Sequence, residues 1–406
     1  MINQKFIEKI REDFPFFYNQ VHPPIYFDNA CTSLKPFSVI EAQKEYFEKF
    51  SACAERSSHA LSEELTKRIE KARQKIAKFI GAKRPEEIIF TKNATEAINL
   101  IAFSFNFKEG DLVLTSDKEH NSNLLPWLFQ VKKRKIRHRI IPSKPDNTFD
   151  FEKFEEILNQ EKNIRLLSIV QTSNLDGHTF PVKEIIKIAH QKGILVLLDS
   201  TQTVPHQPVN VKDLDTDFLV FSGHKMLGPP GIGVLYGKLE LLEKLDPFLL
   251  GGGTVSNSFY SDYHLLKPPQ KFEAGIQNYS GILGLEAAVD YLEKIGFQKI
   301  REQEELLNSY ITEKLLEFPE IEIIGPKNPK ERGSIISFII KNKDSQEVAL
   351  LLEEISKIYV RAGQFCVHSW FNARQIKSAV RASFYFYNTL EEAEIFIKTI
   401  ERIIKL

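Results

Sequence analysis

The sequence has few cysteines and no long apolar run. Its 406 residues contain only Cys31, Cys53 and Cys366. Three cysteines in a chain of this length make no disulfide framework and favour a reducing compartment. The N-terminal residues mix charged and apolar side chains, and no stretch reaches the roughly 20 apolar residues of a membrane span. We therefore expect neither a signal peptide nor a membrane helix, and we predict a cytoplasmic protein.

The chain also lacks an excess of charge of either sign. Lys and Arg total 54, Asp and Glu total 54, and the formal net charge is zero. This balance excludes a general nucleic-acid binder or membrane-surface binder, although it permits a local basic pocket. The hydrophobic share of 42% and the charged share of 27% are typical of a globular protein, and the length predicts two domains.

Short apolar runs alternate with helical patterns in the first two thirds of the chain. The apolar runs predict strands at residues 87–90, 112–115, 137–141, 166–170, 195–198, 218–221 and 233–236. The apolar spacing between them predicts helices at residues 65–79, 93–105, 151–160 and 182–192. Strands that alternate with helices form a mostly parallel sheet, and unbroken apolar runs fit strands covered on both faces. The predicted fold class is therefore α/β.

A different pattern begins near residue 284. It predicts helices and strands, in chain order, at residues 282–294, 298–317, 321–324, 334–340, 346–355 and 390–404. This order indicates a smaller α+β domain over residues 284–406, which follows a large α/β domain over residues 25–283. We expect residues 1–24 to pack with the small domain.

Lys225 and Asp199 follow two of the predicted strands. Lys225 comes after the apolar run 218–221 and before a turn rich in glycine and proline. A lysine in a dry pocket has a lowered pKa and can attack an aldehyde as a neutral amine, whereas most lysines are solvated surface charges. Asp199 follows the run 195–198, at the strand end where open α/β sheets bind ligands. Its carboxylate could keep a pyridinium nitrogen protonated, or it could cap a helix.

Three further strand ends carry polar candidates. Asn93 and Glu96 have the spacing of a capping box, so a helix begins there. Its free N–H groups and the Thr95 hydroxyl would seat a phosphate, although many helices begin this way without a ligand. His120 and Asn174 follow two other strands, and each alone has an ordinary structural explanation. Together the strand ends supply a phosphate seat, a stacking ring, an amide, a carboxylate and a lysine, which predicts one binding site.

Nine motifs, in their order and spacing, connect the chain to a known family. They are Tyr26-Phe27-Asp28-Asn29-Ala30, Arg56-Ser57-Ser58-His59, Ala94-Thr95-Glu96-Ala97-Ile98-Asn99, Glu119-His120-Asn121, Ser222-Gly223-His224-Lys225, Gly251-Gly252-Gly253, Phe272-Glu273-Ala274-Gly275, Arg361-Ala362-Gly363-Gln364-Phe365-Cys366 and Arg381-Ala382-Ser383. With them the chain resembles the class V, fold-type I pyridoxal-phosphate enzymes, and it looks most similar to the group II (SUF-type) cysteine desulfurases and selenocysteine lyases. The resemblance implies a large domain whose mostly parallel sheet is flanked by helices, and a smaller α+β C-terminal domain that carries the cysteine loop.

The resemblance implies a binding site for pyridoxal 5'-phosphate. The residues that would hold this cofactor are Thr95, His120, Asp199, Gln202, Ser222, His224 and Lys225. Lys225 would form the Schiff base and carry protons, and His120 would stack on the ring and take part in catalysis. Asp199 would pair with the pyridine nitrogen and Gln202 with the phenolic oxygen, while the phosphate would be held by Thr95, Ser222 and His224.

The resemblance also implies a substrate and a reaction. Asn174, Arg381 and Arg361 would bind the substrate, Arg381 through a bidentate fork. Cys366 would be the nucleophile that takes sulfur, and a neighbouring arginine can lower the pKa of such a thiol. The implied enzyme is a homodimeric transferase that converts L-cysteine into L-alanine and leaves a persulfide on Cys366 for a sulfur-acceptor protein, as in iron–sulfur cluster assembly.

Other functions stay open at this point. A selenocysteine lyase, an aminotransferase or another C–S lyase of class V would need Lys225 but not Cys366. A scaffold that only keeps the cofactor fold and binds a partner would need neither.

The sequence departs from the family pattern at several positions. Phe365 stands where a histidine is usual before the nucleophilic cysteine, and His368 could take over a proton transfer. Ile276 stands where group II has a threonine that reaches the partner subunit's cofactor phosphate. Cys31 replaces a small residue. We interpret Cys31 and Cys53 as packing thiols, since their spacing fits no standard zinc pattern, and we expect no metal.

Overall fold

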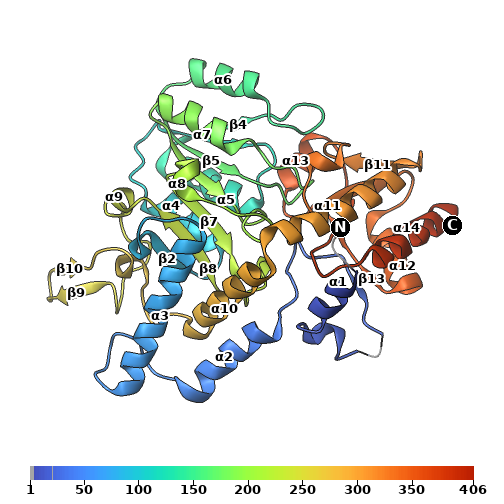
Figure 1. Ribbon diagram of the computed structural model, residues 1–406. Coiled ribbons are helices and arrows are strands. Elements are labelled where there is room, and N and C mark those ends of the chain that lie inside the picture. The colour runs from blue at the N-terminus through green and yellow to red at the C-terminus, as the bar shows by residue number, and fades with distance from the viewer. Residues whose placement is uncertain (1–3, 21) are drawn as a thin grey trace.

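A seven-stranded sheet forms the centre of the molecule (Figure 1). The structure, a computed structural model, describes residues 4–20 and 22–406. The strands lie in the order β2-β8-β7-β6-β5-β3-β4, and all run parallel except β8, which is antiparallel to both of its neighbours. Their bounds are β2 (Ile88–Thr91), β3 (Leu112–Ser116), β4 (Arg137–Ile141), β5 (Ile164–Val170), β6 (Leu195–Asp199), β7 (Phe218–Ser222) and β8 (Gly233–Gly237). The predicted α/β class with a mostly parallel sheet is confirmed.

A second, antiparallel sheet lies at the right of Figure 1, in the order β11-β12-β15-β14. Its bounds are β11 (Ile321–Ile324), β12 (Ile335–Ile340), β14 (Arg361–Gly363) and β15 (Ala379–Ser383). Two short pairs complete the strands: the parallel pair of β1 (Ile25–Tyr26) with β13 (Ile358–Tyr359), and the antiparallel hairpin of β9 (Val255–Ser258) with β10 (Tyr263–Leu265). The hairpin projects from the left of the molecule in Figure 1.

Helices cover both faces of the large sheet and pack against the small one. The α-helices are α1 (Gln4–Arg11), α2 (Phe37–Lys49), α3 (Ala60–Phe79), α4 (Ala94–Ser104), α5 (Asn121–Arg134), α6 (Phe151–Gln160), α7 (Val182–Gln191), α8 (Val211–Leu214), α9 (Leu239–Leu242), α10 (Tyr279–Ile295), α11 (Phe297–Leu316), α12 (Ser345–Ser356), α13 (His368–Ala373) and α14 (Leu390–Lys405). The short 3-10 helices are η1 (Pro15–Phe17), η2 (Pro85–Glu87), η3 (Gly223–Lys225), η4 (Gln270–Phe272) and η5 (Pro329–Glu331). Within the described ranges, none of the helices has the length and apolar character to cross a membrane.

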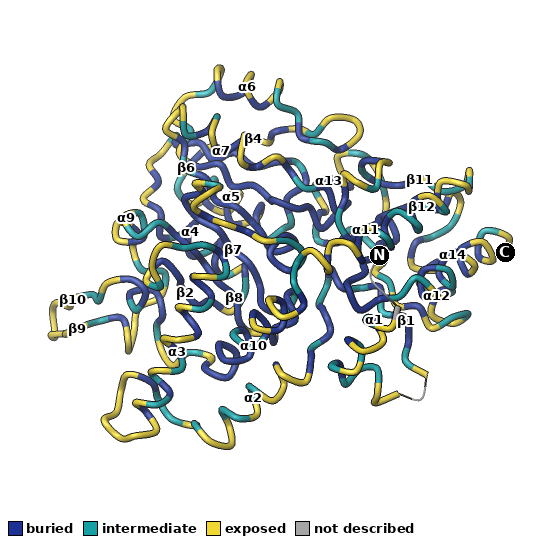
Figure 2. Tube along the Cα trace, in the orientation of Figure 1, coloured by how far each residue is buried: buried dark blue, intermediate teal, exposed yellow. Residues whose placement is uncertain are grey.

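The large sheet is buried on both faces because successive residues of each strand enter different apolar clusters (Figure 2). In β6, Leu197 packs in one cluster with Trp127 of α5. Its neighbours Val196 and Leu198 lie in the cluster on the other face, together with Ile76 of α3. This arrangement explains why these strands are apolar at every position.

Most predicted helices and strands are confirmed to within a few residues, and β4, β11 and α6 have the predicted bounds. The sequence pattern does not predict α5. Its side chains Leu125, Leu128 and Phe129 are apolar yet exposed, and Pro126 lies inside the helix, so the usual amphipathic signal is weakened.

The two sheets have separate apolar cores, but the chain does not break cleanly between them. The predicted boundary at residues 283/284 lies inside α10, which packs against α2 and α3. In the N-terminal segment, Arg11 forms a 2.7 Å ion pair with Glu392 of α14, whereas Phe14 lies in the core of the large sheet. The domain bounds 1–24, 25–283 and 284–406 stay a prediction, and residues 1–3 and 21 lie outside the described residues.

The packing of Phe14 predicts its contribution to stability. Its side chain is 0% exposed and its ring lies 5.7 Å from that of Tyr291 and 4.9 Å from that of Tyr387. Phe14→Ala should lower the free energy of unfolding by about 3–5 kcal/mol, because it leaves a cavity among these rings. Urea unfolding measures this change. The control is Tyr18→Ala, at a side chain that is 57% exposed, and equal effects of the two variants would contradict the packing.

Candidate active site

The candidate polar residues meet at one edge of the large sheet. Asp199 ends β6 and Ser222 ends β7, while His120 and Asn174 follow β3 and β5. Strands β3, β5, β6 and β7 are parallel neighbours, so their carboxyl ends share one edge. In open α/β sheets this edge is where ligands bind.

Lys225 closes the short helix η3 directly after β7. The turn at Lys225 is held by the segment that follows β1. The Thr32 hydroxyl and the Ser33 N–H donate to the His224 carbonyl at 3.0 and 3.1 Å. Burial lowers the pKa of Lys225, Asp199 opposes this shift, and Arg381 adds to it. The Lys225 amine therefore loses its proton more easily than a surface lysine, as a nucleophilic or proton-carrying amine requires.

Asp199 and Gln202 are buried polar side chains at and just after the end of β6. Asp199 is 5% exposed, and its Oδ1 accepts a 3.1 Å hydrogen bond from the Thr201 N–H. Burial raises the pKa of Asp199, against the Thr201 hydrogen bonds and the charge of Lys225. Gln202 donates through Nε2 to the Ala30 carbonyl at 2.8 Å. Among the described residues, Gln202 Oε1 is buried without a hydrogen-bond partner, which indicates a polar ligand beside it.

The N-terminus of α4 lies beside the end of β7. Asn93 Oδ1 caps the helix by accepting from the Glu96 N–H at 2.9 Å. The predicted capping box is only half formed, since the Glu96 carboxylate accepts from the Lys92 N–H instead. The Ala94 N–H donates to Ser222 Oγ at 2.9 Å, so the Ser222 hydroxyl keeps its own proton for a ligand.

Thr95 and His120 are connected through Ser122, which the sequence does not single out. The exposed Thr95 hydroxyl lies 2.7 Å from Ser122 Oγ, and Ser122 Oγ lies 2.9 Å from His120 Nδ1. His120 also caps α5 by accepting from the Ser122 N–H. Burial lowers the pKa of His120 to about 3, and the charges of Lys225 and Arg381 add to the shift. The imidazole is therefore neutral at physiological pH.

Arg381 and Asn174 meet at the cysteine loop. Arg381, on β15, is 3% exposed and donates through Nη1 to the Asn174 carbonyl at 3.0 Å and through Nη2 to Asp28 Oδ1 at 3.4 Å. Asn174 Nδ2 donates to the Phe365 carbonyl at 2.8 Å, and the Arg381 guanidinium lies 4.9 Å from the centre of the Phe365 ring. Arg381 Nε has no partner among the described residues. Arg361 differs from these residues, because it pairs with Arg381 across the strands but is exposed.

Cys366 is half-buried, and the backbone around it has an unusual conformation. Phe365 and Cys366 have φ values of 50° and 61°, in the left-handed region that favours glycine, and Gly363 has φ 121°. The loop is held against the start of α5, since the Asn121 N–H donates to the Cys366 carbonyl at 2.7 Å. Asn121 Nδ2 and His368 Nδ1 lie 2.8 Å apart. Two consecutive strained residues at a candidate nucleophile fit a site where the surrounding structure imposes the conformation.

Cys31 lies in a segment that borders this site, and its interpretation as a packing thiol stays a prediction. It is half-buried, and its N–H donates to the Asp28 carbonyl at 3.0 Å. The sequence contained a signal, since Cys31 directly follows the motif of residues 26–30. In residues 4–20 and 22–406, no group of three or more His, Cys, Asp or Glu side chains is placed to hold a metal ion.

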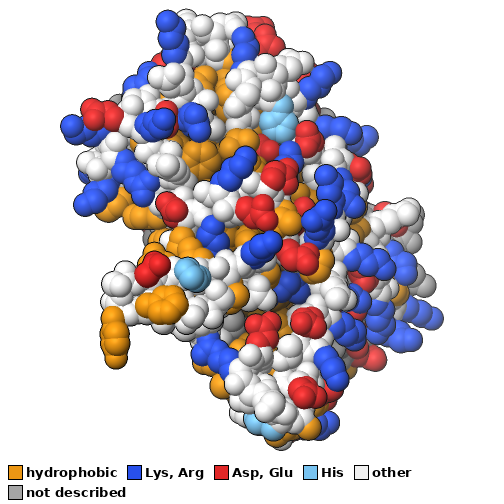
Figure 3. Space-filling view, turned by 90° about the vertical axis from the view of Figure 1, so that its left-hand side faces the viewer, with side chains coloured by type: hydrophobic (Ala, Val, Ile, Leu, Met, Phe, Trp, Pro, Cys, Tyr) orange, Lys and Arg blue, Asp and Glu red, His pale blue; other side chains and the backbone are white. Residues whose placement is uncertain are grey.

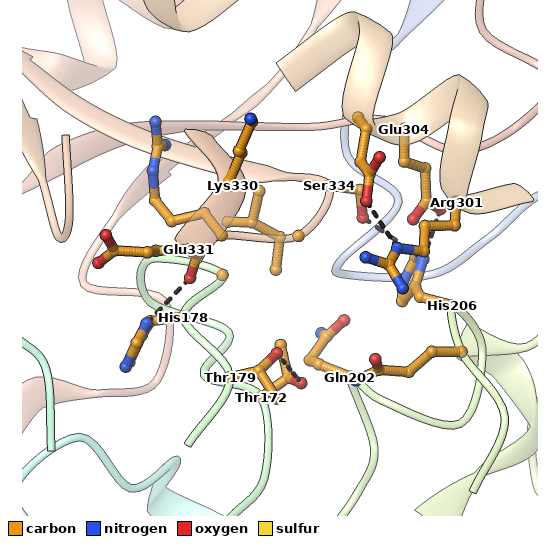
Figure 4. A pocket seen from close by; sticks show the side chains of 16 residues that line it. Thr172, His178, Thr179, Gln202, His206, Arg301, Glu304, Lys330, Glu331 and Ser334 are labelled. Carbon is orange, nitrogen blue, oxygen red and sulfur yellow. Dashed lines mark hydrogen bonds and ion pairs between the residues drawn. The ribbon is translucent and has the colours of Figure 1, made fainter. Parts of the chain in front are cut away.

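A separate cavity of about 330 Å³ lies behind Gln202 (Figure 4). Gln202, Thr172 and Thr179 form one side of it, and Glu304 and Ser334 form the opposite side. Its lining does not include the candidate lysine, aspartate or cysteine, so this cavity is not the candidate active site.

Comparisons with known proteins match this geometry. A family model described as aminotransferase class-V matches residues 25–396. A probable cysteine desulfurase of Synechocystis sp. is 38% identical over 98% of this chain and 95% of its own. The apo structure of the cysteine desulfurase from Thermococcus onnurineus NA1 has a TM-score of 0.93 and 39% identity, with 98% of each chain covered. The crystal structure of the Escherichia coli cysteine desulfurase CsdA (S-sulfonic acid) has a TM-score of 0.90 and 30% identity, with 100% of this chain and 99% of that chain covered.

The environment of His120 predicts its titration. Because its pKa is lowered to about 3, its ring should stay neutral where an ordinary histidine, with a pKa of about 6.5, takes a proton. The unfolded chain binds that proton first, so His120 reduces stability as pH falls from about 6.5 towards 3. Nitrogen NMR of histidine-labelled protein measures the ring, and the signal missing from His120→Asn identifies it. A His120 signal that titrates near pH 6.5 would contradict the buried environment.

Proposed function

Since this chain belongs to the class-V aminotransferase family, we propose that it is a cysteine desulfurase that depends on pyridoxal 5'-phosphate. It converts L-cysteine into L-alanine and takes the sulfur on Cys366. The observation that carries this proposal is the convergence of Lys225, Arg381 and the Cys366 loop at the carboxyl edge of the sheet. The names of the full-length relatives support the same reaction.

The residues at the strand ends fit the cofactor. The Ser222 hydroxyl, Thr95 and the N-terminus of α4 provide donors for a phosphate, and His224 lies directly before Lys225. The Asp199 carboxylate can hold a pyridinium nitrogen, and the buried Gln202 Oε1 has no hydrogen-bond partner among the described residues. When bound, the cofactor withdraws electrons from the α-carbon of the amino acid.

Arg381 and Asn174 bind and orient the substrate carboxylate. Arg381 keeps Nε free of protein partners, and its guanidinium is fixed from behind by Asp28 and by the Asn174 carbonyl. A buried, positioned guanidinium binds a carboxylate strongly because both partners are charged. This contact also brings the substrate next to the Phe365–Cys366 segment, whose carbonyl the Asn174 side chain holds.

Lys225 moves the α-proton of the substrate. Its lowered pKa gives it a neutral amine that can accept this proton and return it when alanine forms. His120 remains uncharged, so it can lie against an aromatic ring without adding a positive charge to the pocket.

Cys366 takes the sulfur. Its thiolate attacks the sulfur of L-cysteine, a new S–S bond forms, the carbon–sulfur bond breaks with its electrons left on carbon, and protonation of that carbon gives L-alanine. The product on the enzyme is a persulfide, which a sulfur-acceptor protein then removes.

The proposed enzyme is a homodimer. Apolar side chains are exposed along α5 and after α9, at Leu125, Leu128, Phe129, Leu249 and Leu250. The ring of Phe103 connects the two groups. Its centre lies 5.5 Å from the ring of Phe129 and 5.7 Å from that of Phe248, which directly precedes Leu249. Figure 3 looks onto the end of the molecule that carries the β9–β10 hairpin, where further hydrophobic side chains are exposed. A continuous apolar face of this kind marks an interface between subunits.

Removal of Lys225 and of Cys366 tests the proposed function. Cys366→Ala should keep the visible absorption of the bound cofactor but lose alanine formation from L-cysteine by at least about 100-fold, as expected when a nucleophile is removed. Lys225→Ala should lose both the normal absorption and the activity. The matched control is Cys53→Ala, which removes a half-buried thiol outside the site and should change neither. Unchanged turnover in Cys366→Ala would favour a lyase that does not use this cysteine.

Charge placed on the apolar face tests the homodimer. Leu249→Glu combined with Leu250→Glu should weaken self-association by at least about tenfold, because each buried carboxylate without a partner costs more than about 1 kcal/mol. Sedimentation velocity over a concentration series measures this change. Leu350→Glu, at a leucine of α12 that is 59% exposed, is the control. A monomeric parent protein, or an unaffected double variant, would contradict the interface.

A further inference from the structure

The carbonyl oxygen of His224, in the peptide bond that leads into Lys225, is held by several donors of one segment. This segment lies between β1 and α2. The donors are the Thr32 hydroxyl at 3.0 Å, the Ser33 N–H at 3.1 Å, the Ser33 hydroxyl at 3.2 Å and Lys35 Nζ at 2.9 Å. A backbone carbonyl has two lone pairs, so this oxygen is fully satisfied without water. The peptide group next to the reactive lysine is therefore positioned by this segment.

The same segment also supports the turn on the far side of Lys225. The Leu227 N–H donates to Ser33 Oγ at 2.8 Å. Leu227 has a φ of 66°, in the left-handed region that favours glycine, and its side chain is buried. Such a conformation persists only where surrounding contacts impose it. Contacts of one segment thus hold the turn both before and after Lys225.

The segment is itself attached to the small sheet. The Leu34 N–H donates to the Tyr387 hydroxyl at 2.9 Å, and the Tyr26 hydroxyl donates to the Thr32 carbonyl at 2.8 Å. Tyr387 is buried and follows β15, the strand that carries Arg381. The turn of Lys225 is therefore positioned relative to the strand of the arginine that is proposed to bind the substrate.

Lys35 is the one cationic donor to the His224 carbonyl. Its Nζ also donates to Thr32 Oγ1 at 3.2 Å and to the Ser33 carbonyl, so the three N–H groups of an ammonium meet three oxygens. None of these oxygens belongs to a carboxylate, and the side chain is half-buried. A hydrogen bond from a charged donor is about twice as strong as one between neutral groups. Among the donors to this carbonyl, Lys35 therefore provides the strongest contact.

We propose that Lys35 is a positioning residue of this enzyme, whose ammonium group holds the turn of Lys225 where the α-proton of the substrate is transferred; this inference rests on the proposed function. Lys35 acts through the His224 carbonyl and does not touch the substrate. Without the ammonium, the donors of Thr32 and Ser33 remain, but the turn is held less tightly. Misplacement of a reacting group by about 1 Å costs about 100-fold in rate.

The support from Lys35 should depend on pH. Burial lowers the pKa of Lys35 to about 7, so the ammonium, with three donors, predominates below that pH, and the amine, with two, predominates above it. The pKa of His224 is lowered to about 4 by burial and by the charges of Lys225 and Lys35. Burial raises the pKa of Tyr26 and of Tyr387. These three side chains therefore keep their charge near pH 7, and Lys225 is the group that is positioned.

Exchange of the α-proton of L-alanine with D2O tests the inference on the holoenzyme. Proton transfer is reversible, so Lys225 should exchange this proton, and the exchange does not need Cys366. Lys35→Met keeps the apolar stem but removes the ammonium. At pH 6.5 its exchange rate per bound cofactor, measured by proton NMR, should fall at least about tenfold, while the Michaelis constant for L-alanine stays unchanged because Arg381 is intact. The ratio of the wild-type rate to the Lys35→Met rate should fall as pH rises through about 7.

Hydrogen exchange of the apo-protein provides a readout that does not depend on the cofactor. In Lys35→Met, the backbone N–H groups of residues 223–228 should exchange at least about tenfold faster, while those of β5 and β6 keep their wild-type rates. Mass spectrometry of the peptides measures both. The matched control is Lys71→Met, at a lysine of α3 whose side chain is 77% exposed, and it should change neither the α-proton exchange nor the hydrogen exchange.

The outcomes separate this inference from the proposed function. A Lys35→Met enzyme that exchanges the α-proton at the wild-type rate, or a rate ratio that does not change with pH, would overturn the role of Lys35 alone. Faster hydrogen exchange throughout β5 and β6 would show a general loss of stability and would overturn it too. If the wild-type holoenzyme exchanged no α-proton, the proposed proton transfer by Lys225 would be contradicted, and the role of Lys35 with it.

Discussion

The structure depends on one buried guanidinium that joins the two sheets. Arg381 belongs to β15 of the small sheet, yet it donates to Asn174, in the loop after β5 of the large sheet, and to Asp28, in the segment after β1. Its face lies over the ring of Phe365 in the cysteine loop. A charge removed from water needs polar partners, so the contacts of Nη1 and Nη2 fix where the cysteine loop lies relative to the large sheet, and Nε is left for a ligand.

Burial away from water also sets the protonation of the titratable side chains near the Arg381 guanidinium. Burial lowers the pKa of Lys225 and His120 and raises that of Asp199. The first two shifts favour a neutral amine and a neutral ring, which suit proton transfer and stacking. The third shift works against an ionised Asp199, and it is opposed by the Thr201 hydrogen bonds and by Lys225. A pyridinium placed beside Asp199 would supply the charge partner that the carboxylate needs.

The sequence predicts the large sheet and the strand-end residues because both follow from local patterns. Unbroken apolar runs predict β5, β6 and β7, and the polar residue at each carboxyl end indicates the site. The pairing of β15 with β14, and therefore the place of Arg381, comes from contacts between distant segments that periodicity does not encode. Family resemblance provided that residue instead.

The residues that sequence reasoning missed act through such distant contacts. Ser122 has no motif of its own, and it matters because it connects Thr95 with His120. The bonds of Ala30 and Thr32 place the Cys31 segment between Gln202 and His224, a position that the sequence pattern does not predict. Phe365, which departs from the family pattern, is explained by its ring under the Arg381 guanidinium.

The steady-state kinetics of Arg381→Lys with L-cysteine test most directly whether this guanidinium binds the substrate. Lysine keeps the charge but loses the planar fork, so the Michaelis constant should rise and kcat/KM should fall by about 10- to 100-fold, the equivalent of one charge-assisted hydrogen bond of about 1.5–3 kcal/mol. The bound cofactor should keep its visible absorption. Arg137→Lys, in the surface ion pair of β4 with Glu161, is the matched control and should leave kcat/KM unchanged. If Arg381→Lys behaves like that control, the guanidinium neither binds the substrate nor positions the cysteine loop.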